Sequence, residues 1–160
     1  MNEASADDGF ELAVERHVAA SPAVLWRAWT ERTEEWWCPK PWRVRVIEQD
    51  LRVGGRSAML MLGPDGEESP SEGVFLEVVP KQRIVFTDAF RAGWIPQESF
   101  MLGHWEFTPE GAGTRVRACA RHWTHSAMQQ HEAMGFAQGW GTMLDQCAAV
   151  AEAMAAEGAR

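Results

Sequence analysis

The chain carries helical patterns near its two ends and strand patterns between them. Residues 21–30 have the first helical pattern, and a long apolar stripe at helical spacing recurs only over residues 136–154. The residues between these patterns alternate apolar and polar side chains, as half-buried strands do. This order predicts an antiparallel sheet that curls around the long terminal helix. We expect a cavity between sheet and helix, which indicates where a ligand binds but not what the ligand is.

The first elements are bounded by clear local signals. Residues 10–18 alternate apolar and polar side chains, which predicts the first strand. Ser21 can act as an N-cap and Pro22 has a backbone angle suited to the first helical position, so a short helix is expected next. A further short turn is expected to begin at a Thr33 cap.

Strand patterns follow at short intervals, with a Gly-Pro-Asp-Gly hairpin turn at 63–66. They cover residues 43–46, 57–61, 73–79, 83–90, 100–108 and 114–123. The last helical element is expected to begin at Ser126, with Gln129 completing a capping box. The glycines at 135, 139 and 141 are costly inside a helix, so they indicate close packing or a kink near its start.

The composition indicates one domain and limits its partners. The chain has 160 residues, 46% of them hydrophobic, which is enough for a single core. Its formal net charge of −8 disfavours binding to nucleic acid or to anionic membranes, because both require a dense positive surface. No apolar run reaches the roughly 18 residues of a membrane span, and the opening MNEASADDG lacks the pattern of a signal peptide. We therefore expect a cytoplasmic protein with a flexible tail at 1–9 and one domain at 10–157.

Six segments in a fixed order resemble the START-like (SRPBCC, helix-grip) superfamily, and within it the homologues of the activator of the 90-kDa heat-shock protein ATPase. The segments are SPAVLWRAWT, EEWWCP, DLRVGG, GVFLEVVPKQRIVFT, FTPEGAGTRV and GWGTMLDQ. The resemblance spans about residues 10–155. It implies an α+β helix-grip fold, in which a curved antiparallel sheet of six to seven strands wraps around a long C-terminal helix. It also implies two short helices between strands 1 and 2, a largely apolar cavity, and no shared catalytic motif.

Strand alternation and helical spacing then select the side chains that point toward this cavity. Trp94 is added as a lid residue in the loop 92–97, although it could equally pin that loop in place. His122 is added because it shares its parity with inward-facing alanines. The expected ligand-binding residues are Met59, Met61, Phe75, Phe86, Trp94, Trp105, Phe107, Ala120, His122, Trp140, Met143 and Leu144. A fully packed interior without a cavity is the alternative.

Neither a metal site nor a cofactor site is expected. His122, His125 and His131 lie close in the sequence, but no carboxylate or cysteine completes a ligand set of known spacing. The three cysteines are widely spaced and contain no C-x-x-C pair. His104 and Glu106 alternate with inward-facing aromatic residues, so they are expected to face solvent.

Three functions fit these patterns. The first is binding of a small apolar or aromatic molecule, with no catalytic residue assigned. The second is a cyclase/aromatase-like or hydrolase-like enzyme that uses the same cavity, with His122 as acid or base. The third, implied by the resemblance, is co-regulation of a chaperone ATPase in the stress response through an external surface. The sequence is also compatible with a homodimer.

Overall fold

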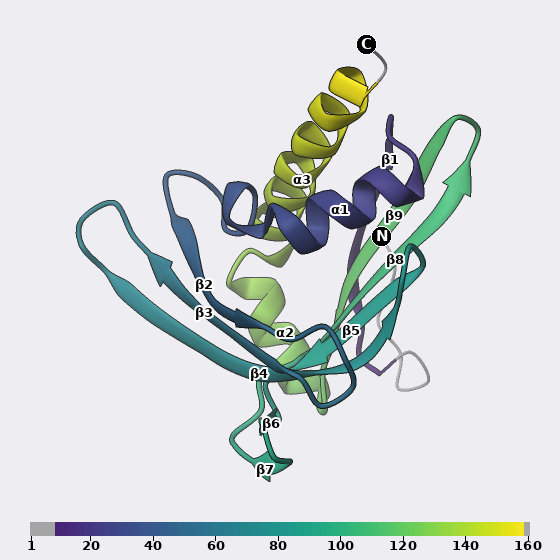
Figure 1. Cartoon of the computed structure of the whole chain (residues 1–160). Coiled ribbons are helices and arrows are strands. Elements are labelled where there is room, and N and C mark those ends of the chain that lie inside the picture. The colour runs from purple at the N-terminus through teal and green to yellow at the C-terminus, as the bar shows by residue number, and fades with distance from the viewer. Residues whose placement is uncertain (1–8, 159–160) are drawn as a thin grey trace.

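The computed structural model describes residues 9–158 and has a mixed α+β architecture. A seven-stranded antiparallel sheet has the strand order β1-β9-β8-β5-β4-β3-β2 and bends into two diverging arms (Figure 1). The strands of this sheet are β1 (Leu12–Val18), β2 (Arg43–Gln49), β3 (Arg56–Leu62), β4 (Glu68–Val79), β5 (Arg83–Thr87), β8 (Leu102–Glu110) and β9 (Gly113–Arg121). The predicted helix-grip fold is confirmed. The predicted flexible tail lies outside the described residues except for Gly9.

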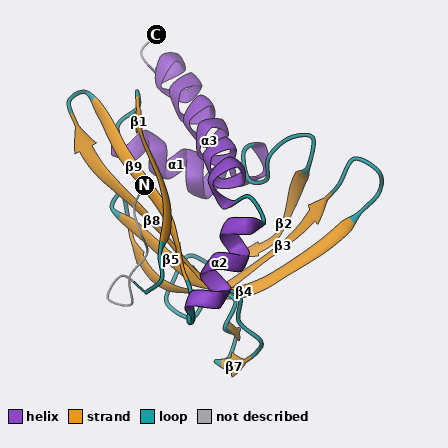
Figure 2. Cartoon of the chain, turned by 180° about the vertical axis from the view of Figure 1, so that it is seen from behind, coloured by secondary structure: helices purple, strands orange, loops and turns teal. Residues whose placement is uncertain are grey.

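The helices lie in the trough between the two arms of the sheet (Figure 2). The helical elements are α1 (Pro22–Glu31), the 3-10 turn η1 (Thr33–Glu35), α2 (His125–Ala133) and α3 (Phe136–Gly158). Helix α3 packs against β1 and α1, and α1 crosses the trough between the arms (Figure 1). Over the described residues 9–158, no helix is long and apolar enough to cross a membrane.

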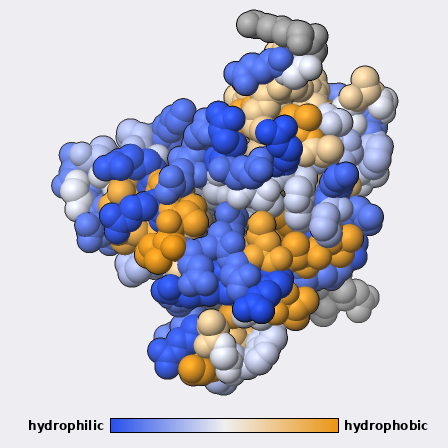
Figure 3. Space-filling view, in the orientation of Figure 1, coloured by the Kyte–Doolittle hydropathy of each residue, from blue (hydrophilic) through white to orange (hydrophobic). Residues whose placement is uncertain are grey.

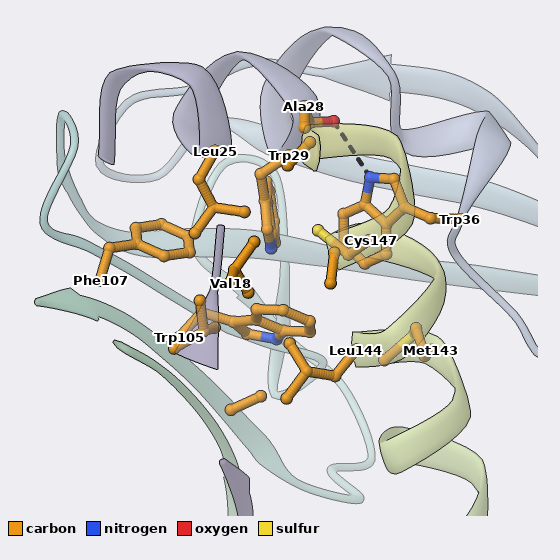
Figure 4. Close-up of a cluster of buried hydrophobic side chains, with 14 of the residues drawn as sticks. Val18, Leu25, Ala28, Trp29, Trp36, Trp105, Phe107, Met143, Leu144 and Cys147 are labelled. Carbon is orange, nitrogen blue, oxygen red and sulfur yellow. Dashed lines mark hydrogen bonds between the residues drawn. The ribbon is translucent and has the colours of Figure 1, made fainter. Parts of the chain in front are cut away.

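Three fully buried tryptophans form the centre of the core (Figure 4). Trp29 and Trp36 come from α1 and the turn after it, and both pack against Trp105 of β8, with ring centroids 6.0 and 5.4 Å away. The indole nitrogen of Trp36 donates to the carbonyl of Ala28 at 3.0 Å. The nitrogen-bearing edge of Trp29 faces the ring of Trp105 (Figure 4), an arrangement in which the ring face can accept an N–H that has no other partner.

The side of the core nearest β8 and β9 is tightly filled. Phe107 and Val116 are paired across these strands, as are Trp105 and Ala118, and all four side chains are buried. Helix α3 adds a stripe of buried side chains to this layer. The stripe contains Met143, Leu144, Cys147, Ala148 and Ala151. The predicted inward faces of these strands and of this helix are therefore confirmed.

The helical segment after β9 differs from the prediction. It consists of two helices, because Gly135 has a φ of +94° and ends α2. Thr124, not Ser126, is the N-cap of α2, since Thr124 has extended backbone and its hydroxyl accepts from the N–H of Ala127 at 3.0 Å. Gly135 thus provides the predicted kink. The close-packing alternative is wrong for Gly139 and Gly141, because a Cβ at either position would meet nothing within 4 Å.

Two further predictions about local structure were wrong. Thr33 does not cap the short turn η1; its hydroxyl instead donates to the carbonyl of Trp29 at 2.6 Å, in the last turn of α1. The strand predicted over 83–90 ends at Thr87. A separate small hairpin follows, formed by β6 (Phe90–Arg91) and β7 (Ile95–Pro96), and it projects from the side of the sheet opposite the helices (Figure 1).

We predict that removing the observed cap, but not the expected one, destabilises the protein. Thr124→Ala should lower the free energy of unfolding by about 1 kcal/mol, because it leaves an N–H at the start of α2 without a partner. Ser126→Ala is the matched control and should change it by less than about 0.5 kcal/mol. Urea denaturation followed by tryptophan fluorescence measures both values, and equal losses would contradict this assignment of the cap.

Candidate functional site

A cavity of about 410 Å³ lies between the β2–β4 arm of the sheet and the start of α3. Most of its wall is apolar, and most of the remaining lining groups are neutral and polar. The large apolar side chains in the wall are Trp29, Trp37, Val46, Met59, Met61, Phe75, Phe86, Phe100, Met101, Trp140 and Met143. Met134, which is 68% exposed, also lines the cavity and therefore marks its mouth.

The strand register explains why these side chains share one face of the sheet. Met59 of β3 is paired with Val46 of β2 and with Ser71 of β4, so the three side chains point to the same side. A bulge between Val46 and Glu48 keeps Gln49 on that side as well. Because the residues facing the cavity from the centre of β3 and β4 include serines and a glycine, the aromatic and methionine side chains around them leave space unfilled.

The carboxylates near the cavity are already paired. Arg56 binds Glu72 at 2.9 Å and Glu48 at 3.3 Å, and this guanidinium lowers the pKa of Glu72. Asp88 accepts from the backbone N–H groups of Phe100 and Met101 at 2.9 and 3.2 Å, which secures the start of the segment leading into β8. Among the residues described, these carboxylates act as structural partners and are not free acids or bases.

Two buried histidines connect the cavity wall to the N-terminal segment. His131 of α2 lines the cavity, and its Nδ1 lies 2.8 Å from Nε2 of His122. His122, just after β9, lies behind it and has its Nδ1 2.9 Å from the carbonyl oxygen of Phe10. Burial, and to a smaller degree the neighbouring His122, lowers the pKa of His131 to about 4. His131 is therefore neutral at pH 7.

The predicted ligand-binding residues divide into those that line the cavity and those that lie behind it. Six line it: Met59, Met61, Phe75, Phe86, Trp140 and Met143. Four are buried in the core without lining it: Trp105, Phe107, Ala120 and Leu144. His122 is also absent from the wall, and His131 occupies the position that was expected for it.

Trp94 lies away from the cavity. It is 50% exposed on the β6–β7 hairpin, where its ring packs edge-on against Phe90 and closely against Gly54. A Cβ at Gly54 would come within 2.9 Å of the Trp94 ring, so this side chain holds the hairpin against the 51–55 loop. The geometry favours the pinning role over the lid.

His104 also differs from the expectation. It lies on the face opposite Trp105, as alternation predicts, but its side chain is only 13% exposed and its Nε2 has no partner among the described residues. Burial, followed by the positive charge of Arg121, lowers the pKa of His104. The expected exposure to solvent is wrong because neighbouring side chains on that face cover the ring.

Sequence reasoning did not identify His131, Trp37 and Cys38 as lining residues. Trp37 and Cys38 follow a 3-10 turn, where neither period two nor period 3.6 assigns a face. The thiol of Cys38 is no nucleophile at neutral pH, since burial raises its pKa to about 11. Within residues 9–158, no group of three His, Cys, Asp or Glu side chains is arranged to hold a metal ion.

We predict that His131 makes the stability of the protein depend on pH. Folding lowers its pKa from 6.5 to about 4, so the unfolded chain binds the proton more readily between these values. Above about pH 6.5, the contribution of neutral His131 to the free energy of unfolding is fully present. As the pH falls toward 4, the free energy of unfolding decreases by up to about 3 kcal/mol.

The variant His131→Gln tests this prediction, because its amide can form a hydrogen bond with His122 but does not titrate. From pH 7 to pH 4, the free energy of unfolding of the wild type should fall by about 3 kcal/mol more than that of the variant. Urea denaturation at a series of pH values measures both curves. Parallel curves would show that His131 is not the titrating group.

Known proteins resemble this chain over almost its whole length. A family model described as "Activator of Hsp90 ATPase homolog 1-like protein" matches residues 19–152. The crystal structure of protein NE0264 from Nitrosomonas europaea is 36% identical, with a TM-score of 0.84 over 91% of this chain and 96% of its own. Protein Ms6760 from Mycobacterium smegmatis is 27% identical, with a TM-score of 0.76 over 92% of this chain and 94% of its own.

More distant structures share the fold alone. The AHSA1 protein SPO3351 from Silicibacter pomeroyi is 22% identical, with a TM-score of 0.65 over 87% of this chain and 95% of its own. No curated protein matches the chain.

Proposed function

Since the chain belongs to the Activator of Hsp90 ATPase homolog 1-like family, whose helix-grip fold it shares, we propose that it binds a small hydrophobic or aromatic molecule in the cavity between the β2–β4 arm and α3. The observation that carries this proposal is the cavity itself. Its volume of about 410 Å³ and its wall of aromatic and methionine side chains are typical of sites for small organic ligands.

Methionine and aromatic side chains suit a range of flat apolar ligands. Met59, Met61 and Met143 have flexible thioether side chains that adapt to the shape of a guest. Trp140 is stacked on Trp105, with 6.4 Å between the ring centroids, so the core supports one rigid aromatic wall of the cavity. Rigid on one side and adaptable on the other, the site can bind an aromatic ring with little reorganisation of the protein.

The arrangement favours binding over catalysis. The carboxylates of Glu72 and Asp88 are engaged with Arg56 and with backbone N–H groups, and the Cys38 thiol is protonated. An enzyme of the cyclase/aromatase-like or hydrolase-like kind would use His131 as its acid or base, because His122 does not reach the cavity. His131 has no carboxylate partner among the described residues that would orient it for proton transfer.

Filling the cavity should weaken binding without weakening the fold. Gly139 of α3 lines the cavity, and a Cβ at this position meets open space. Gly139→Leu should therefore weaken binding of the neutral fluorescent probe N-phenyl-1-naphthylamine at least tenfold, measured by the increase in probe emission. Because a glycine inside a helix is replaced, the variant should be as stable as the wild type or up to about 1 kcal/mol more stable.

Gly141→Leu is the matched control. Gly141 lies on the same helix and also meets open space, but it does not line the cavity. This variant should bind the probe as the wild type does. The proposal fails if the wild type does not bind the probe, or if both leucine variants bind it equally well.

Regulation of a chaperone is a second candidate function. The family description names activation of the Hsp90 ATPase, and one surface feature favours a protein partner. Val53, Trp94 and Ile95 are 65%, 50% and 44% exposed, and Trp94 packs beside Gly54 where the hairpin meets the 51–55 loop. Figure 3 shows further hydrophobic patches on the same face, away from the hairpin, between mainly hydrophilic side chains.

The ATPase rate of Hsp90 distinguishes this candidate. If the exposed apolar group contacts the chaperone, the wild type should change that rate at micromolar concentration and the double variant Val53→Asp/Ile95→Asp should not. Ile47→Asp is the control, because it introduces a charge at an exposed apolar residue of β2, outside this group. This variant should change the ATPase rate as the wild type does. No effect of the wild type on the rate would remove this candidate.

Location, domain extent and oligomeric state are also proposed. The three described cysteines are buried and free, which fits the reducing cytoplasm. A sheet and helices that share one main core support a single START-like domain over residues 10–157. A homodimer would follow from the exposed apolar group acting as a contact surface between two copies, and a role in the stress response would follow from the chaperone candidate.

A further inference from the structure

We propose that the cavity selects ligands that carry a hydrogen-bond donor, such as a phenolic or alcoholic hydroxyl, and that Nε2 of His131 is the acceptor. This inference rests on the proposed binding function and specifies the chemical class of the ligand. It follows from the direction of the hydrogen bonds that connect Phe10, His122 and His131.

The direction of these hydrogen bonds is set at the carbonyl of Phe10, the end farthest from the cavity. The carbonyl oxygen of Phe10 can only accept a hydrogen bond, and it lies 2.9 Å from Nδ1 of His122. His122 must therefore carry a proton on Nδ1. A neutral imidazole has one protonated nitrogen, so in the neutral form of His122 its Nε2 is an acceptor.

The same rule then fixes the tautomer of His131. Its Nδ1 lies 2.8 Å from the accepting Nε2 of His122, so Nδ1 of His131 carries the proton and donates it. Nε2 of His131 is left with a lone pair. The two ring nitrogens point in roughly opposite directions, and because His122 lies behind the wall, this lone pair points toward the cavity that His131 lines.

Nε2 of His131 is also accessible. Within residues 9–158, no hydrogen bond to it is found. The buried side-chain nitrogen and oxygen atoms without a partner are Trp29 Nε1, His104 Nε2 and Trp105 Nε1, and His131 Nε2 is not among them. His131 is a buried residue, but its Nε2 has no hydrogen-bond partner and is not one of the enclosed atoms. Nε2 must therefore be in contact with open space, and that space is the cavity.

The surroundings keep His131 neutral and hold its ring in place. Phe100 and Phe136 pack against the imidazole, with ring centroids 4.7 and 5.1 Å away, and His122 is the titratable side chain whose charge affects the pKa of His131. Burial lowers the pKa of His131 to about 4, so at pH 7 the ring accepts a hydrogen bond and does not donate one from Nε2. A ligand carboxylate or ketone would face a lone pair at this point.

Other polar groups in the wall do not impose the same direction. The hydroxyls of Thr33 and Thr87 already donate to the carbonyls of Trp29 and Met101. Ser57 and Ser71 have hydroxyls that can rotate to donate or accept, so they accommodate either kind of ligand. The carboxylates of Glu48, Glu72 and Asp88 are already bonded to Arg56 or to backbone N–H groups, and the Gln49 amide can donate or accept. Among the neutral lining side chains described, His131 is therefore the one that accepts but does not donate.

A series of biphenyls of similar shape tests the inference. The wild type should bind 4-phenylphenol about five- to tenfold more tightly than 4-methoxybiphenyl, which keeps the oxygen but has no proton to donate. It should bind biphenyl-4-carboxylate more weakly than either compound. Displacement of N-phenyl-1-naphthylamine at pH 7.5 measures all three dissociation constants.

The variant His131→Leu should bind 4-phenylphenol and 4-methoxybiphenyl with equal affinity. Ser71→Ala, which removes another cavity hydroxyl, is the matched control and should keep the wild-type preference. The measurement on the wild type alone decides the matter if the leucine variant does not fold.

Three outcomes would overturn the inference. If the wild type binds all three biphenyls equally well, the cavity binds apolar ligands but His131 does not select among them, and the proposed function stands. If it prefers the carboxylate, His131 donates and the tautomer assignment is wrong. If it binds neither the probe nor any biphenyl, the proposed function fails and this inference fails with it.

Discussion

The packing of Trp29 and Trp36 against Trp105 is the contact on which the rest of the structure depends. It joins α1 and the turn after it to β8, in the middle of the curved sheet, and Leu144 and Cys147 of α3 share the same core. The three indoles pack together with other buried apolar side chains, Leu25, Leu144 and Cys147 among them, and these groups fill the trough on this side (Figure 4). The sheet is thereby held apart from α3 at a distance set by large rigid groups. On the β2–β4 side, where methionines, serines and a glycine face the helix, the same separation leaves the cavity open.

The break between α2 and α3 gives the cavity its polar group. If the chain had continued as one helix, residues before Gly135 would have extended along the axis of α3. The positive φ of Gly135 redirects α2, and His131 then packs between Phe100 and Phe136 with its Nδ1 toward His122. The carbonyl of Phe10 completes this connection from the opposite end of the sequence. A local backbone feature that glycine permits therefore determines which histidine meets the cavity.

The fold was predictable from the sequence to a greater extent than the site. Alternation correctly assigned Met59 and Met61 to the inner face because both lie within a regular strand, where period two holds. It was less useful for His122, since β9 ends at Arg121 and the parity of a strand does not extend beyond its last residue. It also gave no information on Trp37, in an irregular turn, or on the β6–β7 hairpin that carries Trp94. Thr124 and Ser126 illustrate the same limit, since both can cap a helix and only the extended backbone of Thr124 decides between them.

By itself, the sequence determined the order of strands and helices and the face on which most side chains lie. These properties depend on residues two to four positions apart in the sequence, so each segment is sufficient to specify its own. Only the tertiary structure decided that Trp105 and Leu144 fill the core whereas Trp140 and Met143, with the same inward direction, line a cavity. It alone also paired His131 with His122. Whether an inward side chain meets another side chain or empty space depends on the separation of the β2–β4 arm from α3, and that separation results from contacts between residues far apart in the chain.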